Sequence, residues 1–355
     1  MTRTGVRKAA LALTVAALAA VAAGACLLSV EYNKVDAVGD AGDAGGGAAS
    51  ADCGTPGDEP QALSCTEGTL TGGKADCVSK DGEESCCRSL AVPCGTFQRS
   101  FDGVYFTDGD AGAALPNFRL DKYEATVGRF REFVSTDGRG TGESPPSQGA
   151  GAHPGNGSSG WKAEWSEKLE KNLVNLRTAF EKCADATWTT TPTKEKRPIN
   201  CVTWYEAFAF CAWDGGWLPS EAEWNYAAAG GAAQRVYPWS NPPDQAELDA
   251  NHAIFGQPIG EVGSRPPGEG LWHHLDLAGN VAEWVMDWQD WGKPGAKYET
   301  PCDNCVTLAN PDYRVVRSGA FGSTDPKELA AGAHSSLAPG TRSASVGFRC
   351  ARPAK

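Results

Sequence analysis

The sequence lacks an excess of positive charge, and its N-terminal apolar run is too short to cross a membrane. Its 355 residues include 32 Lys and Arg against 44 Asp and Glu, for a net charge of −12 and a pI near 5.0. A nucleic-acid binder needs a basic face, so this balance argues against that class. Apolar residues at 41% and charged residues at 21% indicate a globular chain. The 43 Gly and 22 Pro predict many turns and little regular secondary structure.

The N-terminus has the pattern of an export signal. Arg3, Arg7 and Lys8 precede an uncharged, mostly apolar run of fifteen residues, and small residues lead up to Cys26. We expect residues 1–25 to be a secretory signal peptide, because a membrane helix needs about 20 apolar residues. A cysteine directly after small residues resembles a lipobox, which predicts lipidation of Cys26 and anchoring to the membrane of the cell envelope. Plain secretion is the alternative.

Three regions of different composition follow the signal. Residues 26–52 are rich in Gly, Ala and Asp and are expected to form a flexible tether. Residues 53–94 have few large apolar side chains but six of the 13 cysteines, namely Cys53, Cys65, Cys77, Cys86, Cys87 and Cys94. Disulfides are the expected stabilising bonds there, although six cysteines allow fifteen pairings. Zinc is the less favoured alternative, because this segment has no paired CxxC motifs and no histidine. Residues 95–353 are expected to form one long domain.

Helix signals are few in that domain. Thr203 with Glu206, and Ser220 with Glu223, are capping boxes that open two helices ending at Gly pairs. Apolar residues at helical spacing predict further helices over 126–134 and 165–180. Residues 136–160, of low complexity, are expected to form an exposed loop.

Five segments occur in an order that identifies a family. They are FRLDKYEATVGRFREFV (118–134), RPINCVTWYEAFAFCAW with GGWLPSEAEWNYAAAGG (197–231), YPWSNPPDQAELDANHAIFG (237–256), GLWHHLDLAGNVAEWVMDW (270–288), and RVVRSGAFG with VGFRCAR (314–322 and 346–352). Together they resemble the formylglycine-generating enzyme family, also called the sulfatase-modifying factor family. The resemblance covers about residues 90–353. It implies an α+β fold with little regular structure, held by loops, disulfides and calcium.

The resemblance also implies a reaction that this chain lacks the residues to perform. Family oxidases convert a sulfatase cysteine to formylglycine with oxygen and copper held by two cysteines, which are soft ligands suited to Cu(I). Here Ser323 stands at the first cysteine position, and Lys327 or Glu328 at the second. We therefore expect no copper and no catalytic residue of that type. A related class with a non-haem iron is also not expected, because the five histidines form no HxxxHxE pattern. They are interpreted as solvated loop residues.

The resemblance also implies how cysteines of the domain are paired. Cys211 and Cys350 match a pair that is bonded in the family, and would close a loop worth about 4–5 kcal/mol. Cys183 and Cys201 are then expected partners across the TTTPTKEKRP loop. Cys302 and Cys305 form a CxxC motif, for which a local disulfide is favoured over a redox pair or a soft-metal site.

LDLAGNVAEW matches a calcium site of the family. Asp276 and Glu283 would supply carboxylates, and Gly279 and Val281 backbone carbonyls, which are the hard oxygen ligands that calcium prefers. The alternative is that Asp276 caps a turn and Glu283 is solvated.

Two classes of function remain open. The first is an exported scaffold or binding module, stabilised by calcium, for a peptide, protein or glycan. The second is an oxidoreductase of unknown substrate that reuses the same cleft. Trp204, Trp224, Trp284 and Trp288 are interpreted as core residues, so they indicate no ligand.

Overall fold

The computed structural model describes residues 57–65, 77–79, 82–135, 137–289, 297–308 and 312–354. The expected signal peptide, the tether, Cys26 and Cys53 lie outside these residues. Within the described residues, no helix has both the length and the apolar character needed to span a bilayer.

Four α-helices carry the local signals of the sequence. They are α1 (Val127–Ser135), α2 (Leu173–Lys182), α3 (Trp204–Trp213) and α4 (Glu221–Ala229). Both capping boxes are confirmed: Thr203 and Ser220 each accept from the backbone of the glutamate three residues on, whose side chain bonds back. Helix α4 ends at Gly230, whose φ of +65° is the left-handed conformation that glycine adopts without steric cost.

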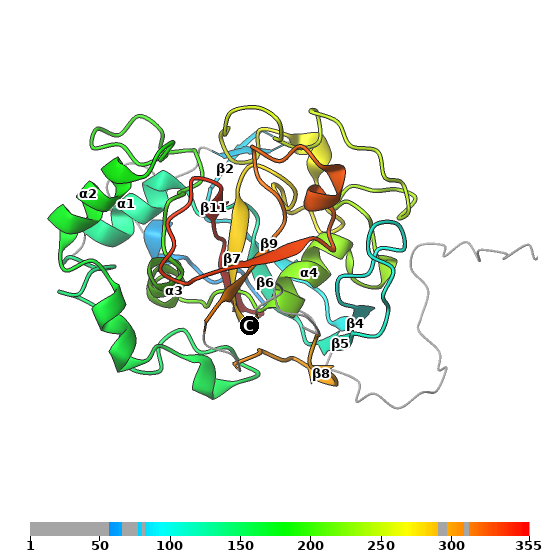
Figure 1. Cartoon of the computed structure of the whole chain (residues 1–355), viewed down its shortest axis with the longest axis horizontal. Coiled ribbons are helices and arrows are strands. Elements are labelled where there is room, and N and C mark those ends of the chain that lie inside the picture. The colour runs from blue at the N-terminus through cyan, green and yellow to red at the C-terminus, as the bar shows by residue number, and fades with distance from the viewer. Residues whose placement is uncertain are drawn as a thin grey trace, which may run out of the picture. The chain divides into compact units, whose positions relative to one another are not determined.

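A four-stranded sheet lies at the centre of the domain. Its strand order is β10 (His334–Leu337), β9 (Arg314–Arg317), β7 (Ala282–Trp288) and β11 (Val346–Gly347), with only the β7–β11 pair parallel. Figure 1 shows β7 and β9 in the middle, α1, α2 and α3 gathered on one side, and α4 on the other.

Two three-stranded sheets and one hairpin complete the fold. The first sheet joins β12 (Ala351–Pro353), β6 (Phe118–Asp121) and β3 (Ser89–Val92); the second joins β4 (Gly95–Gln98), β5 (Gly112–Leu115) and β8 (Cys302–Asp303). The hairpin pairs β1 (Cys77–Ser79) with β2 (Gly82–Glu84). Strand β3 belongs to the cysteine-rich segment, so part of that segment is built into the domain.

The core is aromatic. Trp204, Trp224 and Trp284 are fully buried and Trp288 is 8% exposed, which confirms the core interpretation of these four side chains. The Arg314 guanidinium lies between two of their rings, 3.5 Å from the Trp204 centroid and 3.4 Å from that of Trp288. Such stacking partly compensates for burying a cation.

Two local expectations were wrong. The segment 165–180 is interrupted: a 3₁₀ helix over Ala163–Lys168 ends before α2, because Asn172 caps a new helix through the backbone of Asn175. The loop over 136–160 is also not simply exposed, since Thr141, His153 and Ser159 are buried in it. Polar side chains that find internal hydrogen bonds can be buried without an apolar pattern in the sequence.

Disulfides join distant and neighbouring segments alike. The structure forms Cys183–Cys201, Cys211–Cys350 and Cys302–Cys305, the three pairs expected in the domain. In the cysteine-rich segment Cys65 is bonded to Cys87, and Cys86 and Cys94 are also disulfide-bonded.

Candidate functional site

The segment after β9 holds the residue that replaces the first copper cysteine. Ser323 closes a tight turn: its N–H donates to the Ala320 carbonyl at 2.9 Å, and its Oγ accepts from the Ala320 N–H at 3.1 Å. Lys327 and Glu328, the two candidates for the second position, are exposed in the 3₁₀ helix that follows. The hydroxyl is thus engaged in its own turn, and no soft ligand stands beside it.

No cysteine of the domain remains to bind copper in their place. All six cysteines of residues 95–354 are in disulfides. A disulfide sulfur carries no thiolate charge and is a poor ligand compared with a thiolate. The side chains present at this position do not fit a copper ion.

The motif LDLAGNVAEW lies at a fully buried ion pair. Both Glu283 oxygens accept from the Arg349 guanidinium at 2.7–2.9 Å, and Oε2 also accepts from Trp224 Nε1 at 2.8 Å. Glu283 is 0% exposed, so the alternative in which it is solvated is wrong. Asp276 accepts from the Gly263 N–H at 2.6 Å, which links the motif to a second loop.

A third carboxylate adds negative charge there. Glu124 accepts from the Val281 N–H at 2.9 Å and from Asn280 Nδ2 at 2.6 Å, and is fully buried. Burial, reinforced by the charges of Asp276 and Glu283, raises the pKa of Glu124. Burial likewise raises the pKa of Asp276 to about 6. We call Glu124, Asp276, Glu283 and Arg349 the motif cluster; it holds three carboxylates against one guanidinium.

The motif cluster is not a ready-made cage of side-chain ligands. Among the described residues, no three His, Cys, Asp or Glu side chains are grouped so that they could hold a metal ion. The expected calcium ligands include only two side chains, Asp276 and Glu283, and the second of these is shared with Arg349. The surplus of buried negative charge nevertheless suits a divalent cation.

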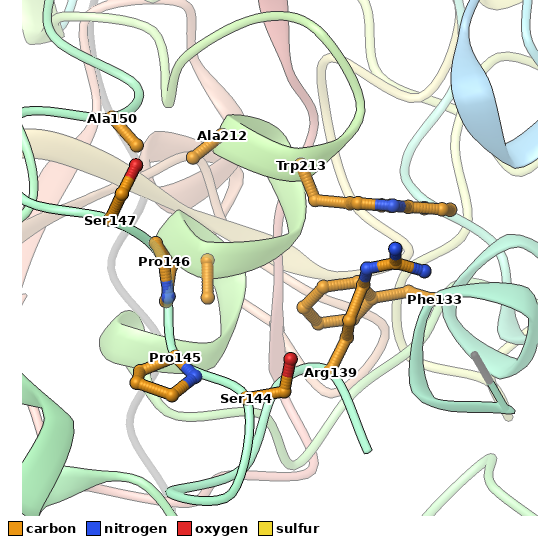
Figure 2. Close-up of a pocket in the computed structure, with 10 residues that line it drawn as sticks. Phe133, Arg139, Ser144, Pro145, Pro146, Ser147, Ala150, Ala212 and Trp213 are labelled. Carbon is orange, nitrogen blue, oxygen red and sulfur yellow. The ribbon is translucent and has the colours of Figure 1, made fainter. Parts of the chain in front are cut away.

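A cavity that we call the smaller cavity lies against α3, and a second one, described after it, is called the larger cavity. The smaller cavity measures about 200 Å³ and is bounded by the loop after α1, by Pro145 and Pro146, and by the end of α3. Figure 2 shows the Arg139 guanidinium next to the Trp213 ring at one end of it, and Ser147 with Ala150 at the other. The guanidinium carbon is 5.8 Å from that ring centroid, so a cation already occupies the aromatic surface.

The larger cavity measures about 580 Å³ and lies over the connection between β4 and β5. Its walls are Arg99, Ser100, Tyr105, Phe106, Thr107, Asp108, Asp110, Ala111, Lys297, Tyr298, Thr300 and His334. Neither Ser323 nor any member of the motif cluster is among them. The sequence analysis missed this cavity, because its residues come from three separate segments with no shared motif.

Hydrogen bonds tie the polar groups of this cavity together. Ser100 Oγ lies 2.5 Å from Tyr298 Oη and 3.1 Å from His334 Nδ1, and accepts from Arg317 Nη1 at 3.0 Å. Tyr298 Oη donates to Glu221 Oε1 at 2.9 Å. We call Ser100, Tyr298 and His334, with Arg317 and Glu221 behind them, the cavity floor.

Comparison with known proteins identifies the fold and the family. Residues 74–354 match the profile of the sulfatase-modifying factor enzyme 1-like domain. The chain belongs to this family. It is 29% identical over 288 residues to the formylglycine-generating enzyme of Streptomyces coelicolor, a match that covers 75% of this chain and 89% of that protein.

One curated relative is named as inactive, and one solved structure shares the fold. The inactive C-alpha-formylglycine-generating enzyme 2 of Bos taurus is 26% identical over 303 residues, covering 76% of this chain and 89% of that one. The structure of PvdO from Pseudomonas aeruginosa superposes with a TM-score of 0.50 at 21% identity, covering 80% of this chain and 99% of that one. The mixed α+β fold expected of a sulfatase-modifying factor domain is therefore confirmed.

Two of the five histidines are buried, contrary to the expectation, whereas His273 is exposed as expected. His153 and His274 are 1% exposed, so they are not solvated loop residues. His153 Nδ1 accepts from the Gly155 N–H, which leaves the proton on Nε2, 3.2 Å from Glu223 Oε1. His274 lies against the Leu120 carbonyl. Each is held by protein groups, and among the described residues no metal-binding histidine cluster forms.

Proposed function

We propose that this protein is an exported sulfatase-modifying-factor domain that binds a ligand and does not make formylglycine. The observation that carries the proposal is the turn at Ser323, where a hydroxyl engaged with its own backbone replaces the first copper ligand. The oxidation needs two thiolates near one copper ion, and all domain cysteines are in disulfides. The alternative is an oxidoreductase of another chemistry. It is less favoured, because fold membership alone does not carry an activity.

A conversion assay tests this proposal. The purified protein is incubated with a peptide carrying the sulfatase cysteine motif, with copper and a reductant, and the peptide mass is measured. We expect no loss of sulfur and no new aldehyde, while the Streptomyces coelicolor enzyme converts the peptide in parallel. Turnover that persists after contaminating host oxidase has been removed would overturn the proposal.

A paired substitution sharpens the result. Ser323→Cys with Glu328→Cys places two thiols in this segment, and we expect the double variant to bind Cu(I) more tightly than the parent chain does. Ser144→Cys, in the smaller cavity, is the control for an added thiol elsewhere. If the double variant binds no more Cu(I) than this control does, the lack of two thiols is not the reason why this segment cannot bind copper.

We further propose that calcium stabilises the motif cluster. Asp276 and the carbonyls of Gly279 and Val281 would hold the ion, with Glu283 shared between it and Arg349. The ion would balance buried negative charge that protons must otherwise neutralise. We expect added calcium to raise the melting temperature, Asp276→Asn to remove that effect, and exposed Asp244→Asn to retain it. Equal melting curves with calcium and with chelator in the parent protein would refute calcium binding.

Export and lipid anchoring are proposed from the first 26 residues. The disulfides of the domain support an oxidising compartment. Cys26→Ser should move the protein from the membrane fraction into the soluble exported pool. A parent protein that is already soluble would refute the anchor and leave plain secretion.

A further inference from the structure

The larger cavity combines a strained residue with hydrogen-bonding groups. Ser100 has a φ of +49°, the left-handed conformation that costs a non-glycine residue energy. It is 6% exposed and its N–H donates to Asn225 Oδ1 at 2.6 Å, so the surrounding side chains hold it in this conformation. Backbone strain of this kind is concentrated at binding and catalytic sites, where it positions a side chain.

The groups that the cavity floor presents are neutral. His334 Nδ1 lies 3.0 Å from the Gly332 carbonyl, which can only accept, so this nitrogen carries the proton. Burial and the nearby Arg317 charge lower the pKa of His334 to about 4, and burial raises the pKa of Tyr298. At neutral pH the ring is therefore uncharged and the phenol keeps its proton. With Ser100, the floor is a neutral surface of two hydroxyls and one imidazole that already bond to one another and to the groups behind them.

Charges behind these groups are already engaged. Arg317 Nη1 lies 2.9 Å from Glu221 Oε1, and its Nη2 donates to the Ala331 carbonyl. The Arg99 guanidinium stacks 4.4 Å from the Tyr298 ring centroid and 4.0 Å from Glu221 Oε2. The floor therefore offers no unpaired charge to a ligand ion.

The walls and the rim supply apolar surface and charges of both signs. Tyr105 and Phe106 line the cavity with aromatic rings, and the Phe106 ring centroid lies 6.0 Å from that of His334. At the rim, Asp108 and Lys297 are both exposed. Asp110 is exposed there as well, so two carboxylates repel an anionic ligand, and the Lys297 ammonium group repels a cationic one. A neutral ligand with several hydroxyls can hydrogen-bond to both.

We propose that this cavity is a carbohydrate-binding site that takes a neutral sugar ring. The apolar C–H face of the ring packs on Tyr105 and Phe106, above the neutral floor, and its hydroxyls bond to Asp108 and Lys297 at the rim. A volume of about 580 Å³ lies in the range of small-molecule sites. This inference rests on the proposed binding function and names its ligand class.

Ligand-observed saturation-transfer NMR tests the site. The probes are methyl β-D-glucopyranoside, methyl β-D-galactopyranoside, methyl α-D-mannopyranoside and N-acetylglucosamine, each with the purified protein, and glycerol is the polyol without a ring. We expect transfer to ring protons of at least one sugar, with a Kd in the millimolar range or tighter, and none to glycerol. If none of the four sugars shows transfer, the proposal is wrong.

Substitutions locate the binding. Ser100→Ala removes the hydroxyl that fixes Tyr298 and His334 in the floor, and should weaken binding about tenfold. Because a buried substitution can affect folding, Asp108→Asn at the exposed rim is the second variant and should also weaken binding. Ser147→Ala, in the smaller cavity, should not. Binding unchanged in Asp108→Asn and in folded Ser100→Ala would overturn the assignment, as would loss in Ser147→Ala alone.

The outcomes separate the two proposals. Formylglycine formation would refute the proposed function and would not affect sugar binding at this cavity. Absence of sugar binding, together with no formylglycine, would refute only the carbohydrate site.

Discussion

The motif cluster and the cavity floor both bury charged residues, but only the cavity floor lies beside a cavity. In the motif cluster, the Arg349 guanidinium is surrounded by Glu283 and by four backbone carbonyls, and every one of these partners is protein. In the cavity floor, the charges are paired behind a layer of hydroxyls and an imidazole that faces a cavity. On this comparison the family motif maintains the fold, whereas the proposed ligand site is formed by residues outside it.

The largest predicted effect on stability is the loss of a disulfide, and it should differ between the disulfide near the motif cluster and the one near the cavity floor. Cys211–Cys350 lies next to Arg349 and spans 139 residues, whereas Cys302–Cys305 lies beside Arg99 and spans three. Loop-closure entropy predicts a loss of about 5 kcal/mol for Cys211→Ala with Cys350→Ala, and about 2 kcal/mol for Cys302→Ala with Cys305→Ala. Urea unfolding of both double variants measures the losses. Equal losses would mean that strain or packing, not loop length, decides them.

Removing the guanidinium of the motif cluster should have the next largest effect. Arg349→Met leaves three buried carboxylates without their cation and should cost about 3–5 kcal/mol. Arg131→Met is the matched control, because Arg131 pairs with Glu195 at a partly exposed position and should cost about 1 kcal/mol or less. Chemical denaturation compares the two. A loss in Arg349→Met as small as in the control would contradict the structural role given to the cluster.

Acid should weaken the cavity floor through His334. Its folded pKa of about 4 is below the usual 6.5, so the unfolded chain binds a proton that the folded chain excludes. Its contribution to stability is complete above pH 6.5 and is lost as pH falls toward 4. His334→Gln should make the unfolding free energy less dependent on pH in that window. An unchanged slope between pH 4 and 6.5 would show that His334 does not titrate as its surroundings indicate.

His153 is a control for this prediction, because its pKa is shifted in the opposite direction to that of His334. Burial lowers the pKa of His153, but the Glu223 carboxylate raises it, with a net rise above the usual value even though protonation gives up the bond from the Gly155 N–H to Nδ1. Its stabilisation is therefore complete below pH 6.5 and is lost as pH rises through the folded pKa. His153→Gln should therefore make the unfolding free energy less dependent on pH above pH 6.5, and should leave its pH dependence between pH 4 and 6.5 unchanged.

The smallest effect is expected for a single hydroxyl of the floor. Tyr298→Phe removes two hydrogen bonds, one with Ser100 and one with Glu221, which keeps its bond from Arg317, and should cost about 1–2 kcal/mol. Ser323→Ala, in a partly buried turn, removes one local hydrogen bond to the Ala320 N–H and should change stability by about 0.5 kcal/mol. Thermal unfolding of both variants measures this. A loss in Tyr298→Phe as large as in Arg349→Met would remove the distinction between the two regions.

Local sequence signals predict the structure correctly where three or four neighbouring residues determine it. The capping boxes at Thr203 and Ser220 depend only on a hydroxyl and a glutamate three residues on, and both form. Helical spacing alone does not predict the break before α2. Apolar residues recur at helical spacing on both sides of Asn172, but its side chain caps a new helix there. The 136–160 loop was misjudged for a related reason, since its buried polar residues leave no apolar pattern.

The sequence by itself determined the family, the helix boundaries set by caps, the domain disulfides and the absence of a copper thiolate pair, because each depends on residue type at motif positions. Only the tertiary structure decided that Glu283 is neutralised by Arg349, and that Ser100, Tyr298 and His334 share one cavity. Ser100 is 198 residues from Tyr298 and 234 from His334 in the chain. No periodicity or spacing acts over such distances, so contacts of this kind exist only once the sheets and loops have packed.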